Sequence, residues 1–104
     1  MTLTTATTAP EPSRPPLFPL GHLLATPQVL SVLDAHGIAP LTLLQRHVQG
    51  DWGELVAEDQ QVNQEALREG ARLLSSYHIA PGITVWIITE ADRSVTNLLM
   101  PDDD

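Results

Sequence analysis

The sequence predicts an α+β domain in which three short helices are followed by a three-stranded antiparallel β-meander. Two observations indicate this class. Apolar residues recur at helical spacing up to about residue 70 and alternate with a period of two after it. Prolines and glycines stand where helices would begin and end. We expect residues 18–101 to form one domain, with helices and strands segregated along the chain.

Both ends of the chain are predicted to lie outside this domain. The first 17 residues are rich in Thr, Ala and Pro and carry almost no large apolar side chains. Such a segment buries too little surface to offset its conformational entropy, so we predict a disordered tail over residues 1–17. Order is expected to begin near the run LFPLG, where a short strand would fit. Residues 102–104 are predicted to form a solvated acidic tail.

The first two helices are predicted to form an αα-hairpin. In ATPQVLSVLDAHG, Thr26 suits the N-cap, Pro27 the first helical position and Gly37 the position after the last turn. In APLTLLQRHVQG, Pro40 and Gly50 mark the corresponding ends. The pair resembles a helix-turn-helix in outline.

A third helix and three strands complete the domain. The helix is predicted from about Ala57 to Glu69, with Val62, Ala66 and Leu67 facing inward. The runs ARLLSSYHI, ITVWIITEA and VTNLLM then read as strands joined by short turns. The middle strand is apolar on both faces, so we expect helices to cover one face and a second copy of the chain the other.

The charge of the chain favours a protein partner over a nucleic acid. The 104 residues carry a formal net charge of −8 and include no lysine. Phosphate contacts from basic side chains supply most non-specific nucleic-acid affinity, so direct binding to DNA or RNA is disfavoured. An acidic surface can instead steer the protein towards a partner with a basic surface.

Other function classes lose support from missing motifs. The chain has no cysteine for a disulfide or a thiolate metal site, and its four histidines lack metal-ligand spacing. No phosphate-binding loop, nucleophile elbow or dinucleotide fingerprint occurs, so we expect no metal and no cofactor. No apolar run approaches a membrane span, and we expect a cytoplasmic protein.

The stretch HVQGDWGEL contains the first group of candidate site residues. His47 and Asp51 are the candidate catalytic pair, in which Asp51 would orient the imidazole. Glu54 could act as a second carboxylate and Trp52 as a binding residue. The structural alternative is favoured: the glycines end one helix and free the next segment, Asp51 accepts bonds in the turn, and Trp52 fills a gap in the core.

A second group combines residues from the third helix and the strands. Asn63 lies within the helix, where its propensity is poor, so its side chain is expected to bond a neighbouring segment. Tyr77 could reach a cleft between helix and sheet. Asp92 is expected to form an Asx-type turn and Arg93 a surface ion pair. The structural interpretation is again favoured over a binding role.

Four segments resemble a known family. They are LFPLGHLLATPQVL, LLQRHVQGDWGEL, REGARLLSSY and VWIITEADRSVTNLLMP, which together span residues 17–101. They are similar to small GDWG-containing bacterial proteins of plasmids and integrated mobile elements, which are labelled plasmid-related protein or type I restriction endonuclease subunit M. The NPPF/Y-type motif of a methyltransferase subunit is missing here. The resemblance therefore implies a mobile-element context rather than a reaction.

These observations support three hypotheses. The leading one is a non-enzymatic, acidic protein-interaction module of a mobile element that modulates or inhibits a host defence complex of restriction or CRISPR type. The second is a small hydrolase or nuclease-like enzyme that uses His47 and Asp51. The third is a plasmid-linked transcriptional regulator using the αα-hairpin, whose second helix offers only Arg46 as a base.

Overall fold

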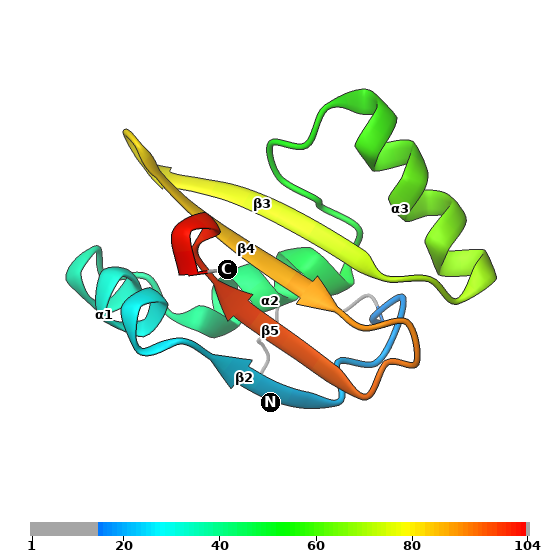
Figure 1. Ribbon diagram of the computed structural model, residues 1–104, viewed down its shortest axis with the longest axis horizontal. Helices are drawn as coiled ribbons and strands as arrows, with labels where there is room; N and C mark the ends of the chain where they lie inside the picture. The colour runs from blue at the N-terminus through cyan, green and yellow to red at the C-terminus, as the bar shows by residue number, and fades with distance from the viewer. Residues whose placement is uncertain (1–14, 104) are drawn as a thin grey trace, which may run out of the picture.

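The computed structural model describes residues 15–103, which form three α-helices, four strands and a short 3-10 helix. Figure 1 shows their arrangement. The elements, in chain order, are β2 (His22–Ala25), α1 (Pro27–Ala35), α2 (Pro40–Val48), α3 (Ala57–Glu69), β3 (Leu73–Ala80), β4 (Ile83–Thr89), β5 (Val95–Leu99) and η1 (Pro101–Asp103).

The helix ends follow the predicted capping chemistry. Thr26 precedes α1 in an extended conformation, and its side chain accepts a 3.2 Å hydrogen bond from the Val29 N–H. Pro27 occupies the first turn, where a missing N–H costs nothing. Gly37 and Gly70 follow α1 and α3 with φ of 66° and 74°, the left-handed conformation that glycine adopts without strain.

The predicted three-stranded meander is incomplete. β3, β4 and β5 do form an antiparallel sheet, but a fourth strand, β2, pairs in parallel with β5, so the sheet is mixed and has the order β2-β5-β4-β3. The prediction was wrong because β2 is only four residues long and pairs with a distant strand, as in Leu23 with Thr96. The local pattern of apolar and polar residues does not predict a pairing between strands so far apart in the sequence.

Helices cover one face of this sheet. α2 lies behind it in Figure 1 and α1 lies beside its end, and their apolar side chains pack against those of β3, β4 and β5. The resulting core contains Val29, Leu33, Leu43, Leu44, Tyr77, Val85, Ile87 and Leu98. The opposite face, which carries Trp86 and Ile88 of the middle strand, has no helix lying across it in Figure 1.

The third helix buries only part of the face predicted for it: Ala66 is buried and Leu67 packs partly buried against the core, as expected, but Val62 does not. Val62 was expected inside but retains 58% of its accessible surface, whereas the neighbouring Asn63 is buried together with Ala66. α3 stands beside the outer edge of β3, where an amide side chain finds backbone partners and a valine does not. Hydrogen bonding therefore sets the rotation of this helix.

The two predicted tails fall partly outside the described residues. Residues 1–14 and 104 lie outside them. Within them, the Leu17 N–H donates a 2.8 Å hydrogen bond to the Val48 carbonyl. Near the other end, the Asp103 carboxylate accepts hydrogen bonds from Thr26 Oγ1 at 2.7 Å and from the Met100 N–H at 3.0 Å. Leu17 and Asp103, which belong to the described parts of the two segments, are thus bonded to the domain.

Candidate functional site

The GDWG segment runs beside the outer edge of β3. Gly53 forms a parallel bridge with Ser76. The Ser76 N–H donates to the Trp52 carbonyl at 3.0 Å, and the Glu54 N–H donates to the Ser76 carbonyl at 2.7 Å. A side chain on Gly53, whose φ is 77°, would overlap the Ser76 carbonyl oxygen. The second glycine of the motif is therefore required by this close backbone approach.

Two predicted binding residues extend the cover of this edge. Asn63 Nδ2 donates to the Leu74 carbonyl at 2.7 Å, and the Leu74 N–H donates back to Asn63 Oδ1 at 3.2 Å. The His78 N–H donates to Glu54 Oε1 at 2.8 Å. Backbone N–H and C=O groups point to alternate sides along a strand, so every second residue of β3 faces the open edge. The contacts above bond backbone groups of three successive edge-facing residues, Leu74, Ser76 and His78. Asn63 and Glu54 thus close a sheet edge.

His47 lies in a buried chain of hydrogen bonds whose direction can be assigned. Thr96 Oγ1 donates to the Leu20 carbonyl at 2.7 Å, so it accepts in its 2.7 Å bond with Thr89 Oγ1. Thr89 therefore donates to Thr96 and accepts from His47 Nε2 at 2.9 Å. The ring proton is then on Nε2, and Nδ1 accepts from Ser75 Oγ at 2.6 Å.

This environment holds the imidazole in its neutral form. Burial lowers the pKa of His47 to about 4, and the positive charge of Arg93 acts in the same direction. Phe18 and Trp52 pack edge-on against the ring, at centroid distances of 5.1 and 5.7 Å. His47 is completely buried, so the imidazole faces protein groups on all sides.

Asp51 is engaged elsewhere. Its carboxylate accepts bonds from Arg46 Nε at 2.7 Å and Nη2 at 3.2 Å, and from the Gly53 N–H at 3.2 Å. The bond from Arg46 lowers the pKa of Asp51. Tyr77 OH donates to the Asp51 backbone carbonyl at 2.6 Å, and burial raises the pKa of that phenol to about 12. The structure thus gives His47 and Asp51 separate partners.

Arg46 and Trp52 also have local contacts. The Arg46 guanidinium lies 4.4 Å from the centroid of the Tyr77 ring, so the one base of the second hairpin helix is held by Asp51 and Tyr77. Trp52 is buried and stacks on Phe18 at a centroid distance of 6.3 Å. Among the described residues, nothing accepts a hydrogen bond from its indole N–H.

The last two predicted residues form the β4–β5 turn. Asp92 Oδ1 accepts bonds from the Ser94 N–H and hydroxyl, which is the expected Asx-type turn and lowers the pKa of Asp92. Arg93 has a φ of 61°, and its guanidinium donates to backbone carbonyls instead of forming the surface ion pair predicted for it. Its bonds to Ala66 and Ala71 tie this turn to the end of α3.

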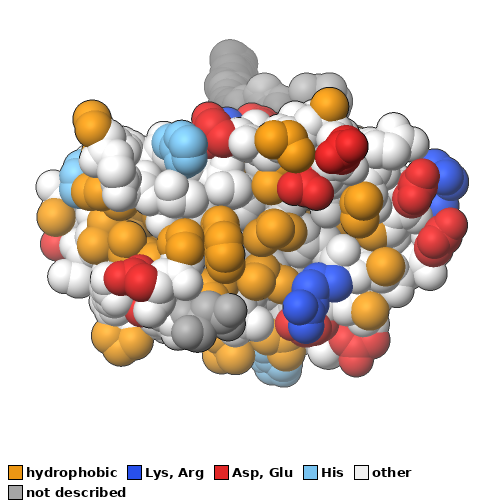
Figure 2. Space-filling model, turned by 45° about the horizontal axis from the view of Figure 1, so that its top comes forward, with side chains coloured by type: hydrophobic (Ala, Val, Ile, Leu, Met, Phe, Trp, Pro, Cys, Tyr) orange, Lys and Arg blue, Asp and Glu red, His pale blue; other side chains and the backbone are white. Residues whose placement is uncertain are grey.

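The open face of the sheet is the surface that these contacts leave available. We define it by two rows of paired residues. One row contains Leu74, Ile88, Asn97 and Leu24, and the other contains Ser76, Trp86 and Leu99. Apart from Ser76, which is almost fully buried, these side chains are partly or fully exposed. Figure 2, which looks obliquely at this side of the molecule, shows hydrophobic side chains gathered across its middle.

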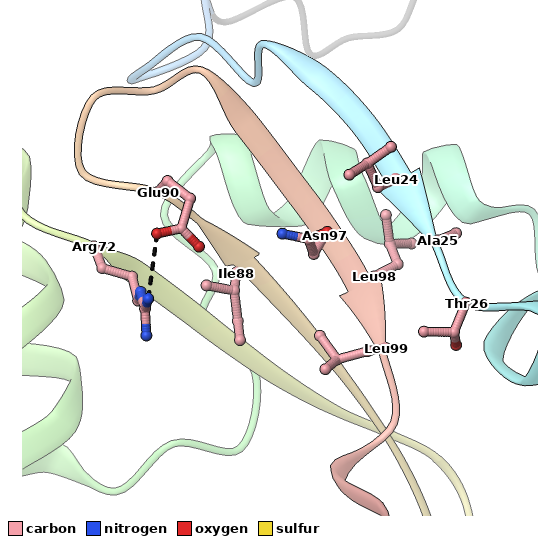
Figure 3. A pocket seen from close by; sticks show the side chains of 9 residues that line it. All are labelled: Leu24, Ala25, Thr26, Arg72, Ile88, Glu90, Asn97, Leu98 and Leu99. Atoms are coloured by element: carbon pink, nitrogen blue, oxygen red, sulfur yellow. Dashed lines mark hydrogen bonds and ion pairs between the residues drawn. The ribbon is translucent and has the colours of Figure 1, made fainter. Parts of the chain in front are cut away.

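The open face is hollowed over β5. A pocket of about 340 Å³ lies between Leu24, Ile88 and Leu99, with Asn97 at its centre (Figure 3). One end is bounded by Arg72, whose Nη2 lies 3.2 Å from Glu90 Oε1. The sequence indicated this face only through the doubly apolar β4. The contributions of Leu24 and Asn97 depend on the β2–β5 pairing, which the sequence does not reveal.

Other kinds of site find no support in the described residues. No three histidine, aspartate or glutamate side chains between residues 15 and 103 are grouped so that they could hold a metal ion. No helix in that range is long and apolar enough to cross a membrane. Comparison with protein-family models, curated proteins and solved structures finds no match to the chain.

Proposed function

We propose that the protein is a non-enzymatic interaction module that binds a partner protein through the open face of its sheet. The observation that carries the proposal is the one-sided covering of the sheet: α1 and α2 pack on one face, while the other face presents Trp86, Ile88 and Leu99. Half-exposed apolar side chains around a hollow, with a polar group at its centre, are typical of a protein-binding surface.

The charge of the chain defines the partner further. The formal net charge is −8, and exposed carboxylates of Glu58, Glu65 and Glu69 follow one side of α3. Figure 2 shows acidic side chains around the central hydrophobic ones. A partner with an apolar centre and a basic rim would match this arrangement, and its association would be accelerated by electrostatic steering.

The resemblance to proteins of plasmids and mobile elements narrows the class of partner. It favours a component of a host defence complex of restriction or CRISPR type, whose nucleic-acid-binding surfaces are basic. An acidic module that occupied such a surface would modulate or inhibit the complex without any catalytic step. The neutral, enclosed His47 supports a structural role for the residue that an enzymatic mechanism would have used.

Site-directed crosslinking tests the proposal. A photoreactive amino acid is placed at Asn97, in the open face, or at Gln28, an exposed position of α1, the helix whose Val29 and Leu33 pack in the core of the covered face. After irradiation in bacterial cells, we expect a crosslinked protein with the Asn97 probe and none with the Gln28 probe. The captured protein is then purified, and its affinity is measured for the wild type, Asn97→Arg and Gln28→Arg.

Asn97→Arg puts a bulky cation into the centre of the hollow and near the basic rim of the partner, so we expect affinity to fall by about tenfold or more. Gln28→Arg should bind like the wild type, and both variants should keep the wild-type melting temperature. Binding should weaken as salt is added. Equal crosslinking at both positions, or unchanged affinity of a folded Asn97→Arg protein, would overturn the assignment of this face.

A further inference from the structure

The two edges of the sheet differ: the β3 edge is covered, whereas the β2 edge is open. The β3 edge is covered by Asn63, Glu54 and the 52–54 segment, as described above. The β2 edge has no neighbour beyond it in the described part of the chain. All four residues of β2 are exposed, and Leu23 and Leu24 retain 51% and 54% of their accessible surface. An uncovered strand edge is a template for pairing with another strand.

The backbone of β2 has groups free for such pairing. The His22 N–H donates to the Ser94 carbonyl at 2.9 Å, and the Thr26 N–H donates to the Leu98 carbonyl at 3.1 Å. Because peptide groups alternate in direction along a strand, those of Leu23 and Ala25 point away from β5. β2 carries no lysine, arginine or carboxylate, no proline and no bulge, so its short length of four residues is its one protection as an open edge.

Hollows flank this edge on both faces of the sheet, an apolar one on the helix side and one of mixed polarity on the other. On the helix side, a hollow of about 330 Å³ is bordered by Leu23 of β2 and by Leu41 and Leu44 of α2. None of its lining residues is charged. On the other side, Leu24 borders the pocket of the open face. A strand added to β2 would direct alternate side chains towards these two hollows, so its sequence should be apolar on both faces.

We propose that the occupant of this edge is β2 of a second copy, which pairs with it antiparallel about a two-fold axis. The sequence HLLA itself is uncharged and places leucines on both faces, as the edge requires. Two chains of net charge −8 repel each other, and neither β2 nor the lining of its helix-side hollow contains a carboxylate, which favours contact at this region. Two-fold dimers are the commonest symmetric assembly.

This pairing would produce a continuous eight-stranded sheet. A two-fold axis perpendicular to the sheet keeps both helix layers on one side and joins the two open faces on the other. β2 has only four residues, so the backbone bonds are few, and contacts of Leu23 with the neighbouring helix-side hollow supply the apolar part of the interface. The inference does not depend on the proposed function, because the dimer would form in the absence of any other protein.

The mass of the full chain in solution tests the inference. Sedimentation equilibrium across the micromolar range should give a species of twice the 11.3 kDa chain mass. Leu23→Lys puts a cation on the edge strand and should shift the equilibrium to the monomer. Val62→Lys changes a similarly exposed apolar residue on α3 and should stay dimeric. Circular dichroism shows whether both variants keep the wild-type fold.

Hydrogen exchange gives a second measurement that needs no substitution. In the dimer, the amides of Leu23 and Ala25 should exchange more slowly as protein concentration rises, whereas in a monomer they would be free. Added salt should tighten the dimer by screening the repulsion, opposite to its effect on binding a basic partner. A wild type that stays monomeric, a dimer that survives in Leu23→Lys, or rapid Leu23 and Ala25 exchange in the dimer would each overturn the proposal.

Discussion

His47 Nε2 donates a 2.9 Å hydrogen bond to Thr89 Oγ1 inside the protein, and this bond joins α2 to β4. Ser75 and Thr96 extend it into a chain that crosses the sheet from β3 to β5. Polar groups buried in this way stabilise a fold only while each has its partner. The loss of any one member should therefore cost more than its size suggests.

The first prediction concerns acid. The folded protein holds the pKa of His47 near 4, whereas the unfolded chain takes up the proton near 6.5. Protons therefore favour the unfolded state between these values, and the free energy of unfolding should fall as pH drops from about 6.5 to 4, by roughly 3 kcal/mol in total. Urea unfolding at a series of pH values measures this slope.

Two variants test whether His47 causes this dependence of the free energy of unfolding on pH. His47→Gln should be less stable at pH 7 and should lose most of the pH dependence between 6.5 and 5. His78→Gln changes an exposed histidine of β3 and should keep the wild-type slope. A slope that persisted unchanged in a folded His47→Gln protein would show that another titrating group is its source.

Thr89→Val should destabilise the protein although it changes the side-chain volume very little. The substitution removes the acceptor of the His47 Nε2 proton and the donor to Thr96, and leaves both groups buried. We expect a loss of about 2 kcal/mol in the free energy of unfolding, measured in urea. Thr84→Val, on the same strand but half-exposed, should change stability by less than about 0.5 kcal/mol. Equal effects of the two substitutions would contradict the assigned network.

Asn63→Ala should release α3 from the sheet. The substitution leaves the Leu74 N–H and carbonyl without their partners, and we expect a loss of about 2 kcal/mol or more. The Leu74 amide should also exchange its hydrogen faster, because the edge of β3 becomes open to water. Gln64→Ala, at an exposed position of the same helix, provides the control and should be neutral. Slow exchange of Leu74 in the Asn63→Ala protein would show that another group covers this edge.

Gly53→Ala should be far more damaging than Gly82→Ala. Both glycines have φ above 70°, so each substitution introduces about 1 kcal/mol of backbone strain. At Gly82 a new methyl group meets nothing within 4 Å, whereas at Gly53 it would overlap the Ser76 backbone and the Tyr77 ring. We expect a loss of more than about 3 kcal/mol at Gly53, read as a lower denaturation midpoint. Similar midpoints for the two variants would be incompatible with the bridge to Ser76.

Local chemistry accounts for what the sequence predicted well. Thr26, Pro27 and Gly37 mark the two ends of α1 because capping depends on residues next to each other in the chain. The three antiparallel strands follow from alternation and short turns for the same reason. These signals act within a few residues and need no knowledge of the rest of the fold.

Long-range pairing accounts for what was missed. The partners of His47 come from β3 and β4, 28 and 42 residues away, and no local pattern connects them. For the same reason, Asn63 was recognised as unusual in a helix but not as the residue that closes the β3 edge. The pocket of the open face needs β2 beside β5, and its composition could not be predicted from either strand alone.

The parallel pairing of β2 with β5 also constrains how the chain folds. Leu23 pairs with Thr96, and Thr26 bonds to Asp103, 77 residues away. Contacts of such long sequence separation form slowly, because much of the chain must be ordered before they close. During synthesis, β2 leaves the ribosome before the helices and must remain unpaired until β5 has followed. β2 is thus synthesised first but pairs only after β5 has been synthesised. Until then, the apolar β2 segment stays exposed in the nascent chain.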